Sequence, residues 1–200
     1  ERLAVGTRAT YPWAMTQRNT TVLQILAQHP SQDAKEAADV SMIERFAQEH
    51  EHIFGKSNPL GHITGSALVL DESGRLLLTF HAKLERWLQV GGHSDPHEHD
   101  PAETALREAQ EESGLPDLIF HPAFGRAPVD IDVHRIPARK TEAAHDHLDF
   151  RYVLLTRRPE EIICTKESKA LQWVSLDKTS GLGFDPALER AVQKVSEGLG

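Results

Sequence analysis

Three glutamates near the end of a short predicted helix are the residues of this sequence best suited to chemistry. Glu108, Glu111 and Glu112 follow one another at spacings of one, three and four residues, so their carboxylates gather on one side of a helix. Like charges at this spacing repel, and the last turn of a helix disfavours negative charge. A divalent cation that takes oxygen ligands would remove both penalties. The cluster therefore predicts a magnesium-type site, with Arg107 placed to brace Glu111.

A glycine pair ahead of this helix supports the prediction. Residues 87–90 have the composition of a short strand, which ends at Gly91 and Gly92. Such a pair lets the backbone approach a phosphate or a metal closely and can leave a carbonyl free as a ligand. The alternative interpretation is a solvated acidic face, since many exposed helices carry such charges. The glycines favour the metal site.

The segment 91–115 resembles the signature of the Nudix family, G-x5-E-x7-R-E-U-x-E-E-x-G-U, in which U is apolar. Gly92 and Glu98 fit its first half, and residues 107–115 fit its second half without a mismatch. Eight residues separate the two halves where the family has seven. We place the extra residue in the loop before the helix, which leaves the helical part of the signature intact.

The resemblance implies a fold of the α/β class, a Nudix-type α/β/α sandwich with a mixed sheet. It implies hydrolysis of a phosphoanhydride (pyrophosphate) bond in a nucleoside diphosphate derivative or a nucleotide-like substrate. Mg²⁺ or Mn²⁺ would be the cofactor, held by Glu108, Glu111 and Glu112, with the carbonyl of Gly91 as a further candidate ligand. The ion would polarise a phosphoryl oxygen and lower the pKa of a bound water that attacks phosphorus.

The resemblance leaves the general base open. Arg107 would orient a glutamate, and Glu108 is one candidate for the base. The other candidates are carboxylates of later loops: Glu142, Asp146 and Glu167. The sequence does not rank them. It also carries no convincing signature for ADP-ribose, dinucleoside polyphosphates or coenzyme A, so the substrate stays open.

A second polar group follows the helix in the chain. Because strand residues alternate between two faces, His147, Asp149 and Arg151 are expected to share one face of a strand. Together with His134 they are our candidate substrate-binding residues, for contact with phosphate or a second metal. The alternative is polar residues on an open sheet face. A zinc site is not favoured, since no cysteine accompanies the histidines.

The elements that must position these residues are predicted from capping and periodicity. A helix over 101–113 begins after Asp100 as N-cap and ends at Gly114. Its apolar stripe is rich in alanine, which lets a helix lie close to a sheet. Further helices are expected at 20–28, 32–52 and 186–197, and strands at 66–71, 75–80, 87–90, near 117–134, 149–156 and 170–175.

The expected division is an N-terminal helical extension over residues 1–60, packed on the same domain, and a Nudix hydrolase domain over 61–200. The segment 32–52 could be two helices, because Ser41 and Glu44 are spaced like a capping box. A lid, a dimer contact and a simple packed extension are all open as roles for the first helices.

Composition limits the partners. Thirty acidic residues against 22 basic ones give a net charge of −8, which argues against binding duplex nucleic acid through a basic face. We find no apolar run near the roughly 20 residues that cross a bilayer and no secretory signal, so no membrane partner is expected. The lone Cys164 is expected in an apolar strand and favours a reducing, cytoplasmic location. The expected partner is a small phosphorylated substrate, and a homodimer is allowed.

Three alternatives to the hydrolase remain. The first is a Nudix-like sensor that binds a nucleotide without turnover, although a sensor has no need for the full carboxylate cluster. The second is an isomerase of the isopentenyl diphosphate type, which would use an active-site cysteine, whereas Cys164 lies far beyond the signature. The third is a nonenzymatic acidic interaction domain.

Overall fold

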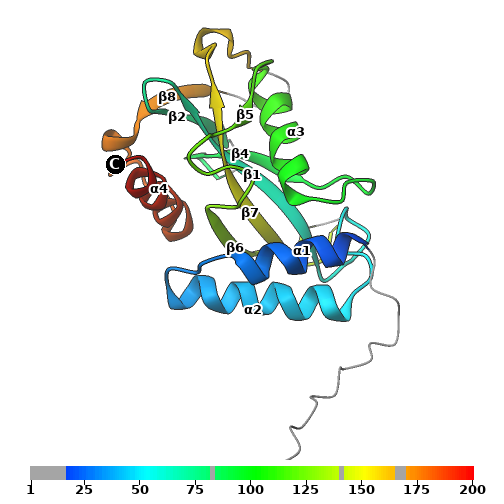
Figure 1. The fold of residues 1–200 in the computed structure, drawn as a ribbon. Helices are drawn as coiled ribbons and strands as arrows, with labels where there is room; N and C mark the ends of the chain where they lie inside the picture. The colour runs from blue at the N-terminus through cyan, green and yellow to red at the C-terminus, as the bar shows by residue number, and fades with distance from the viewer. Residues whose placement is uncertain (1–16, 82–83, 140–141, 165–169) are drawn as a thin grey trace, which may run out of the picture.

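The computed structural model describes residues 17–81, 84–139, 142–164 and 170–200, which form a mixed sheet with helices on both of its faces (Figure 1). The α/β class predicted from the sequence is confirmed. The helices are α1 (Gln17–Gln28), α2 (Ala34–Glu49), α3 (Pro101–Ser113) and α4 (Pro186–Leu199). The strands are β1 (Gly61–Asp71), β2 (Arg75–His81), β3 (Arg86–Leu88), β4 (Val90–His93), β5 (Ile119–Phe120), β6 (Asp130–Ile136), β7 (His145–Thr156) and β8 (Leu171–Ser175).

The centre of the sheet is a long parallel pair, β1 and β7, which runs in register from Gly61 opposite Asp146 to Asp71 opposite Thr156. All other pairings are antiparallel. Beyond this pair the sheet divides, because β1 pairs with β4 along one half and with β2 at its end, and β7 pairs with both β6 and β5. The division leaves the early half of β1 beside the glycine strand β4.

Helix α3 packs on one face of the central strands. Its alanines Ala102, Ala105 and Ala109 are fully buried. Gly65 of β1 lies beneath it, where an added Cβ would come within 2.6 Å of a helix carbonyl oxygen. The helix has the predicted ends: the Asp100 side chain caps it, and Gly114 follows in the left-handed conformation. Small residues on both surfaces thus bring the signature helix onto the sheet.

The opposite face is covered at one end by α4, whose Leu188, Ala191 and Val195 are fully buried against strand residues such as Leu68 and Val153. At the other end of this face the strand side chains are polar. The two helices α3 and α4 therefore enclose the sheet as the outer layers of an α/β/α sandwich (Figure 1).

Helices α1 and α2 lie side by side across one end of the sheet, with α2 against β6 (Figure 1). Val22, Ile43 and Ala47 are fully buried in one cluster with Ile63 and Phe150 of the sheet. Helix α2 is continuous, which settles the open question of a break in it. The Ser41 hydroxyl donates to the carbonyl of Ala37 inside the helix and caps no new one.

Three expectations about elements need correction. Strand β1 begins at Gly61, five residues before the prediction, because β7 and β4 pair with its polar first half. The strand expected at 87–90 is two short strands, β3 and β4, that pair with different partners. Cys164 is exposed in the connection after β7, and the prediction of an apolar strand around it is wrong. In the described part of the chain, no helix is long and apolar enough to cross a bilayer.

Candidate active site

The glycine strand β4 is in contact with the glutamates of α3. An added Cβ on Gly92 would lie 2.4 Å from Oε2 of Glu108, so only glycine leaves room for that carboxylate. The Gly91 amide donates to Oε2 of Glu112 at 3.3 Å. Gly91 itself has a φ of 153°, and a Cβ there would meet Ser66 at 2.4 Å. Gly92 therefore allows β4 to lie against α3, and Gly91 allows β4 to lie beside β1.

Arg107 connects the acidic residues of the signature. Its guanidinium donates to Glu98 at 2.8 Å, to Glu108 at 2.9 Å and to Glu111 at 3.0 Å, and it also reaches the His93 carbonyl at 2.9 Å. These carboxylates raise the pKa of Arg107, and the hydrogen bonds that Arg107 donates to Glu98 are the largest cause. A planar group with five donors is suited to such a task. Arg107 thus fixes the positions of α3 side chains relative to β4.

Glu98 is buried and fully engaged in spite of the extra residue that follows it. Its carboxylate accepts from Thr104 and from the Asp95 amide, both at 2.7 Å, as well as from Arg107. Burial alone would raise the pKa of Glu98, but these donors outweigh it and hold the pKa below its usual value. Helix α3 is regular from Pro101 to Ser113, and Glu98 lies in the loop before its cap, where we predicted the extra residue.

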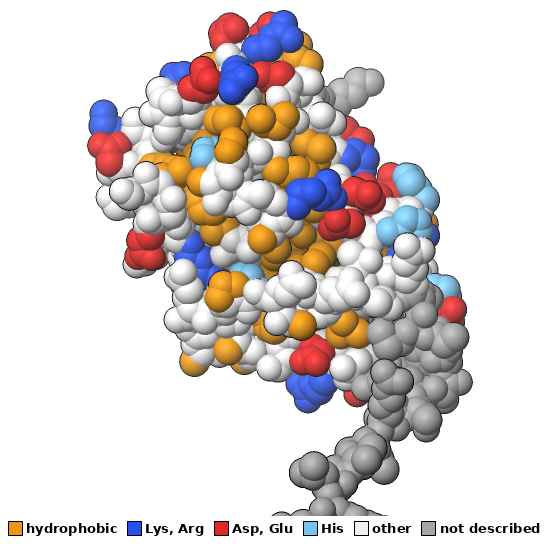
Figure 2. Space-filling model, viewed as in Figure 1, with side chains coloured by type: hydrophobic (Ala, Val, Ile, Leu, Met, Phe, Trp, Pro, Cys, Tyr) orange, Lys and Arg blue, Asp and Glu red, His pale blue; other side chains and the backbone are white. Residues whose placement is uncertain are grey.

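The donor chemistry of the site fits a hard divalent cation. Three carboxylates and the backbone carbonyls of a glycine strand are the oxygen ligands that Mg²⁺ and Mn²⁺ prefer. In this structure Arg107 holds Glu108 and Glu111, whereas Glu112 approaches the amide of Gly91. The site is partly open, since Glu111 is exposed and Glu108 and Glu112 are half-buried. Acidic side chains and histidines gather on the α3 side of the molecule (Figure 2).

The second predicted group shares one sheet face, on the side away from α3. His147, Asp149 and Arg151 of β7 lie opposite His134, Asp132 and Asp130 of β6. Asp149 and Arg151 are only 3% exposed.

Asp149 accepts from Thr64, Ser66 and Arg151 at 2.8 to 3.0 Å. Arg151 also donates to Asp130 at 3.1 Å, and the pKa of Arg151 is raised because these carboxylates outweigh its burial. Both residues are therefore committed to a buried ionic network. His134 and His147 are the members of the predicted group that reach toward solvent.

Comparison with known proteins decides the family. The NUDIX domain model matches residues 61–194, which is most of the chain. The chain belongs to the Nudix family. The match includes the glycine strand, the signature helix and the polar sheet face, and it starts at the first residue of β1.

The Nudix relatives include a probable DHNTP pyrophosphohydrolase of Lactococcus lactis, 33% identical over 117 residues. The aligned part is 58% of this chain and 66% of that relative, slightly less than two thirds of its length. Two solved structures share the fold. The Ap4A hydrolase of C. elegans in a binary complex has a TM-score of 0.55 at 17% identity, covering 68% of this chain and 96% of that chain. The E. coli dihydroneopterin triphosphate pyrophosphohydrolase has a TM-score of 0.50 at 14% identity, covering 66% and 92%.

Sequence reasoning missed His62, which lies within this Nudix domain. It is 2% exposed and stacks on His145, with ring centroids 5.0 Å apart. Strand β1 was expected to start after it, so its partnership with β7 was not foreseen. The signal was present in the alternation of His62, Thr64 and Ser66. These residues pair with His147, Asp149 and Arg151 of β7 and share their sheet face.

The loop carboxylates named as candidate bases lie at different places. Glu142 is exposed, and its Oε1 is 3.8 Å from Nε2 of His145. Asp146 lies in strand β7 and not in a loop as predicted, and its carboxylate accepts from Arg135 at 3.0 Å. Glu167 lies outside the described residues.

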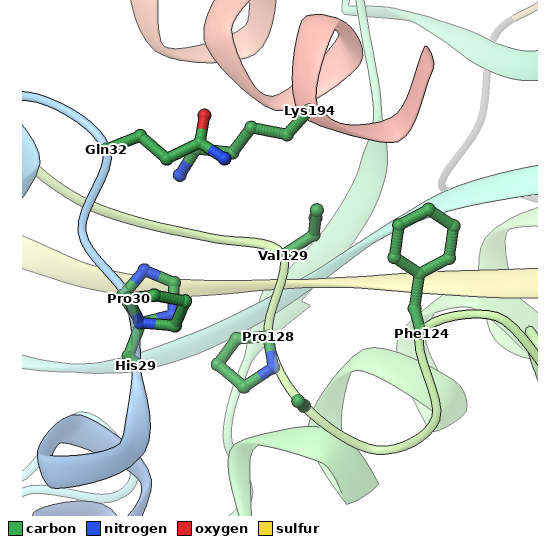
Figure 3. A pocket seen from close by; sticks show the side chains of 8 residues that line it. His29, Pro30, Gln32, Phe124, Pro128, Val129 and Lys194 are labelled. Carbon is green, nitrogen blue, oxygen red and sulfur yellow. The ribbon is translucent and has the colours of Figure 1, made fainter. Parts of the chain in front are cut away.

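A pocket of about 220 Å³ opens between the end of α1, the loop before β6 and α4 (Figure 3). Phe124, Pro128 and Val129 line it, together with the polar residues His29 and Lys194. Both polar residues bind the buried Glu36, at 2.7 and 2.6 Å. The pocket contains none of the signature residues, so it is separate from the candidate active site.

Proposed function

We propose that the protein is a metal-dependent Nudix pyrophosphohydrolase that cleaves a phosphoanhydride bond in a nucleoside diphosphate derivative or a similar nucleotide-like substrate. The observation that carries the proposal is the bonding of Arg107 to Glu98, Glu108 and Glu111 beside the glycine strand. One guanidinium serves three carboxylates there, and Glu112 adds a fourth at Gly91, so a divalent cation would supply the positive charge that Arg107 alone does not.

One relative supports this class of substrate. It is named as a probable DHNTP pyrophosphohydrolase, and that name describes hydrolysis of a pyrophosphate linkage. The overall charge of −8 does not oppose such a substrate, because a divalent cation reverses the local sign of the site. The structure with the better-scoring fold match, the Ap4A hydrolase, supports the fold only.

In the proposed mechanism Glu108, Glu111, Glu112 and the Gly91 carbonyl would hold Mg²⁺ or Mn²⁺. When bound, such an ion polarises phosphoryl oxygens and lowers the pKa of water. Arg107 sets the direction in which Glu108 and Glu111 present their oxygens, because it donates to both carboxylates. Glu98 in turn fixes Arg107 from the buried side. A general base from Glu108, Glu142 or Asp146 would take the proton from the attacking water.

The substrate would extend from the glutamates across β4 to the polar sheet face. His134 and His147 would contact it there, and Asp149 with Arg151 would support that surface from below. Asp149 and Arg151 are only 3% exposed and are bound to each other, so they would position neighbouring residues and would not contact the substrate themselves.

Residues 1–60 would be a helical extension on the Nudix hydrolase domain of residues 61–200, supported by the shared core of α1, α2 and the sheet. We propose a cytoplasmic enzyme with a small phosphorylated partner, supported by the single cysteine and the acidic charge. A homodimer would be tested by light scattering on the purified chain.

The test is hydrolysis of a panel of nucleoside diphosphate and triphosphate derivatives, including dihydroneopterin triphosphate and Ap4A, with and without Mg²⁺. The variants are Glu112→Gln and the matched control Glu103→Gln, which changes an exposed glutamate of the same helix. Turnover that requires both the metal and Glu112, and survives in the control, supports the proposal. Tight nucleotide binding without turnover on any compound would instead establish the sensor.

A further inference from the structure

Five histidine rings meet on the polar sheet face, at the early end of β1 and β7. Their centroids lie 4.8 to 5.2 Å from those of their neighbours. They come from four strands: His62 of β1, His93 of β4, His134 of β6, and His145 and His147 of β7. Residues paired across neighbouring strands share a sheet face, as do alternate residues along one strand. Helix α3 covers the face that carries Gly65, and all five histidines lie on the opposite face. This histidine cluster is not part of the glutamate site.

The inner members of the histidine cluster have unused nitrogen atoms. His62 is 2% exposed, and neither of its ring nitrogens has a hydrogen-bond partner among the described residues. His145 is 4% exposed and bonds the Ala143 carbonyl through Nδ1 at 2.9 Å. Because a carbonyl only accepts, Nδ1 donates this hydrogen bond, and Nε2 is the atom left for a ligand. That Nε2 has no hydrogen-bond partner in the described residues. A carbonyl bound to the remote nitrogen is the usual support for a metal-ligating histidine.

We propose that His62, His145 and His147 form a binding site for a borderline transition-metal cation such as Zn²⁺. One ligand atom from each residue lies within 4.8 Å of the other two. Zinc–nitrogen bonds of about 2.0–2.1 Å bring tetrahedral ligand atoms to about 3.3 Å from one another, so modest side-chain rotations would close the site. Imidazole nitrogens select zinc, nickel or copper over magnesium.

His93 provides a fourth ligand and a link to the signature. Its Nε2 lies 3.2 Å from Nε2 of His147, while its carbonyl accepts from Arg107. The proposed ion would therefore join β1, β4 and β7 where the sheet divides, and would approach the glutamate site through the backbone of β4. The metal site does not depend on the proposed hydrolase function.

The experiment uses the chain without a histidine tag, stripped with a chelator and dialysed. Zn²⁺ binding is measured by calorimetry and metal content, and Co²⁺ binding by the visible absorption of a tetrahedral complex. The variants are His147→Asn and His145→Asn, with His97→Asn as the matched control, since His97 is an exposed loop histidine. Circular dichroism checks folding. His147 is partly exposed, so its variant is the one best able to keep its fold.

We expect one Zn²⁺ per chain, at least about tenfold weaker binding in either cluster variant, and no change in His97→Asn. Glu112→Gln should keep its Zn²⁺, because the two sites use different ligands. Absence of stoichiometric Zn²⁺ or Co²⁺ binding by the wild-type chain overturns the proposal. So does binding that persists in folded His147→Asn and His145→Asn, or binding that only Glu112→Gln abolishes.

Discussion

The carboxylate of Glu108 occupies the space that any side chain on Gly92 would need, with Oε2 only 2.4 Å from the position of an added Cβ. One residue lies on a strand and the other on the signature helix, 16 positions later. Their contact explains why a glycine and a glutamate occur together in this segment. It also shows that the position of Glu108 depends on β4 as well as on its own helix.

Replacing Gly92 with alanine should therefore displace Glu108 without unfolding the protein, because the clash is with the end of a flexible side chain. We expect kcat on the best substrate to fall by about 10- to 100-fold, as for other loss of ligand positioning, with a small change in Tm. The contrast is Gly65→Ala, whose Cβ would meet the backbone of α3 at 2.6 and 2.7 Å. That variant should show a larger fall in Tm than Gly92→Ala, because backbone atoms cannot move aside as a side chain can. Full activity in folded Gly92→Ala would contradict this account.

Arg107→Lys should be far from conservative. A lysine has a compact ammonium in place of a planar fork, and it cannot serve Glu98, Glu108 and His93 together. We expect kcat to fall by at least about tenfold and the Mg²⁺ concentration for half-maximal rate to rise. Arg126→Lys provides the control, because Arg126 makes an exposed pair with Asp100. Equal kinetics for the two variants would refute the role assigned to Arg107.

The buried Glu36 should make stability depend on pH. Burial would raise the pKa of Glu36, but hydrogen bonds from His29, Lys194 and the Gln32 amide hold it well below its ordinary value of 4.5. Since the folded-state pKa is the lower one, its contribution is complete above about pH 4.5 and is lost as pH falls below that value.

Urea unfolding of Glu36→Gln should show a loss of about 3 kcal/mol in unfolding free energy at pH 7, because Lys194 loses a buried partner. The difference from wild type should shrink between pH 5 and pH 3. Glu197→Gln, on the exposed side of α4, should change stability by less than about 0.5 kcal/mol. If the difference in unfolding free energy between wild type and Glu36→Gln stayed constant with pH, the ionised carboxylate of Glu36 would not be the source of the stability.

Arg151→Met should mainly reduce stability. Its removal leaves Asp149 buried without a cation, and breaking a buried ion pair in this way costs about 3–5 kcal/mol. Asp130 keeps Arg190 and Lys194 as partners. Arg135→Met removes an exposed pair with Asp146 and should cost less than about 1 kcal/mol. Thermal unfolding of both variants provides the comparison. A raised KM with unchanged Tm in Arg151→Met would mean direct contact with substrate.

The sequence by itself determined the signature helix. Asp100, Gly114 and the alanine stripe act over neighbouring residues, so the helix ends and its buried face could be predicted without knowledge of the rest of the chain. The spacing of Glu108, Glu111 and Glu112 depends only on helix geometry. For the same reason the family and the α/β class followed from one local segment.

Only the tertiary structure decided which polar residues are open to a ligand. The parallel register that places His62 opposite His147 joins segments 85 positions apart, and local pattern does not specify it. Alternation along β7 predicted that His147, Asp149 and Arg151 share a face. Whether that face is covered depends on α4 and β6, which bury Arg151 among carboxylates and leave His147 partly exposed. Burial is a property of the packed layers, so it could not be read from the strand alone.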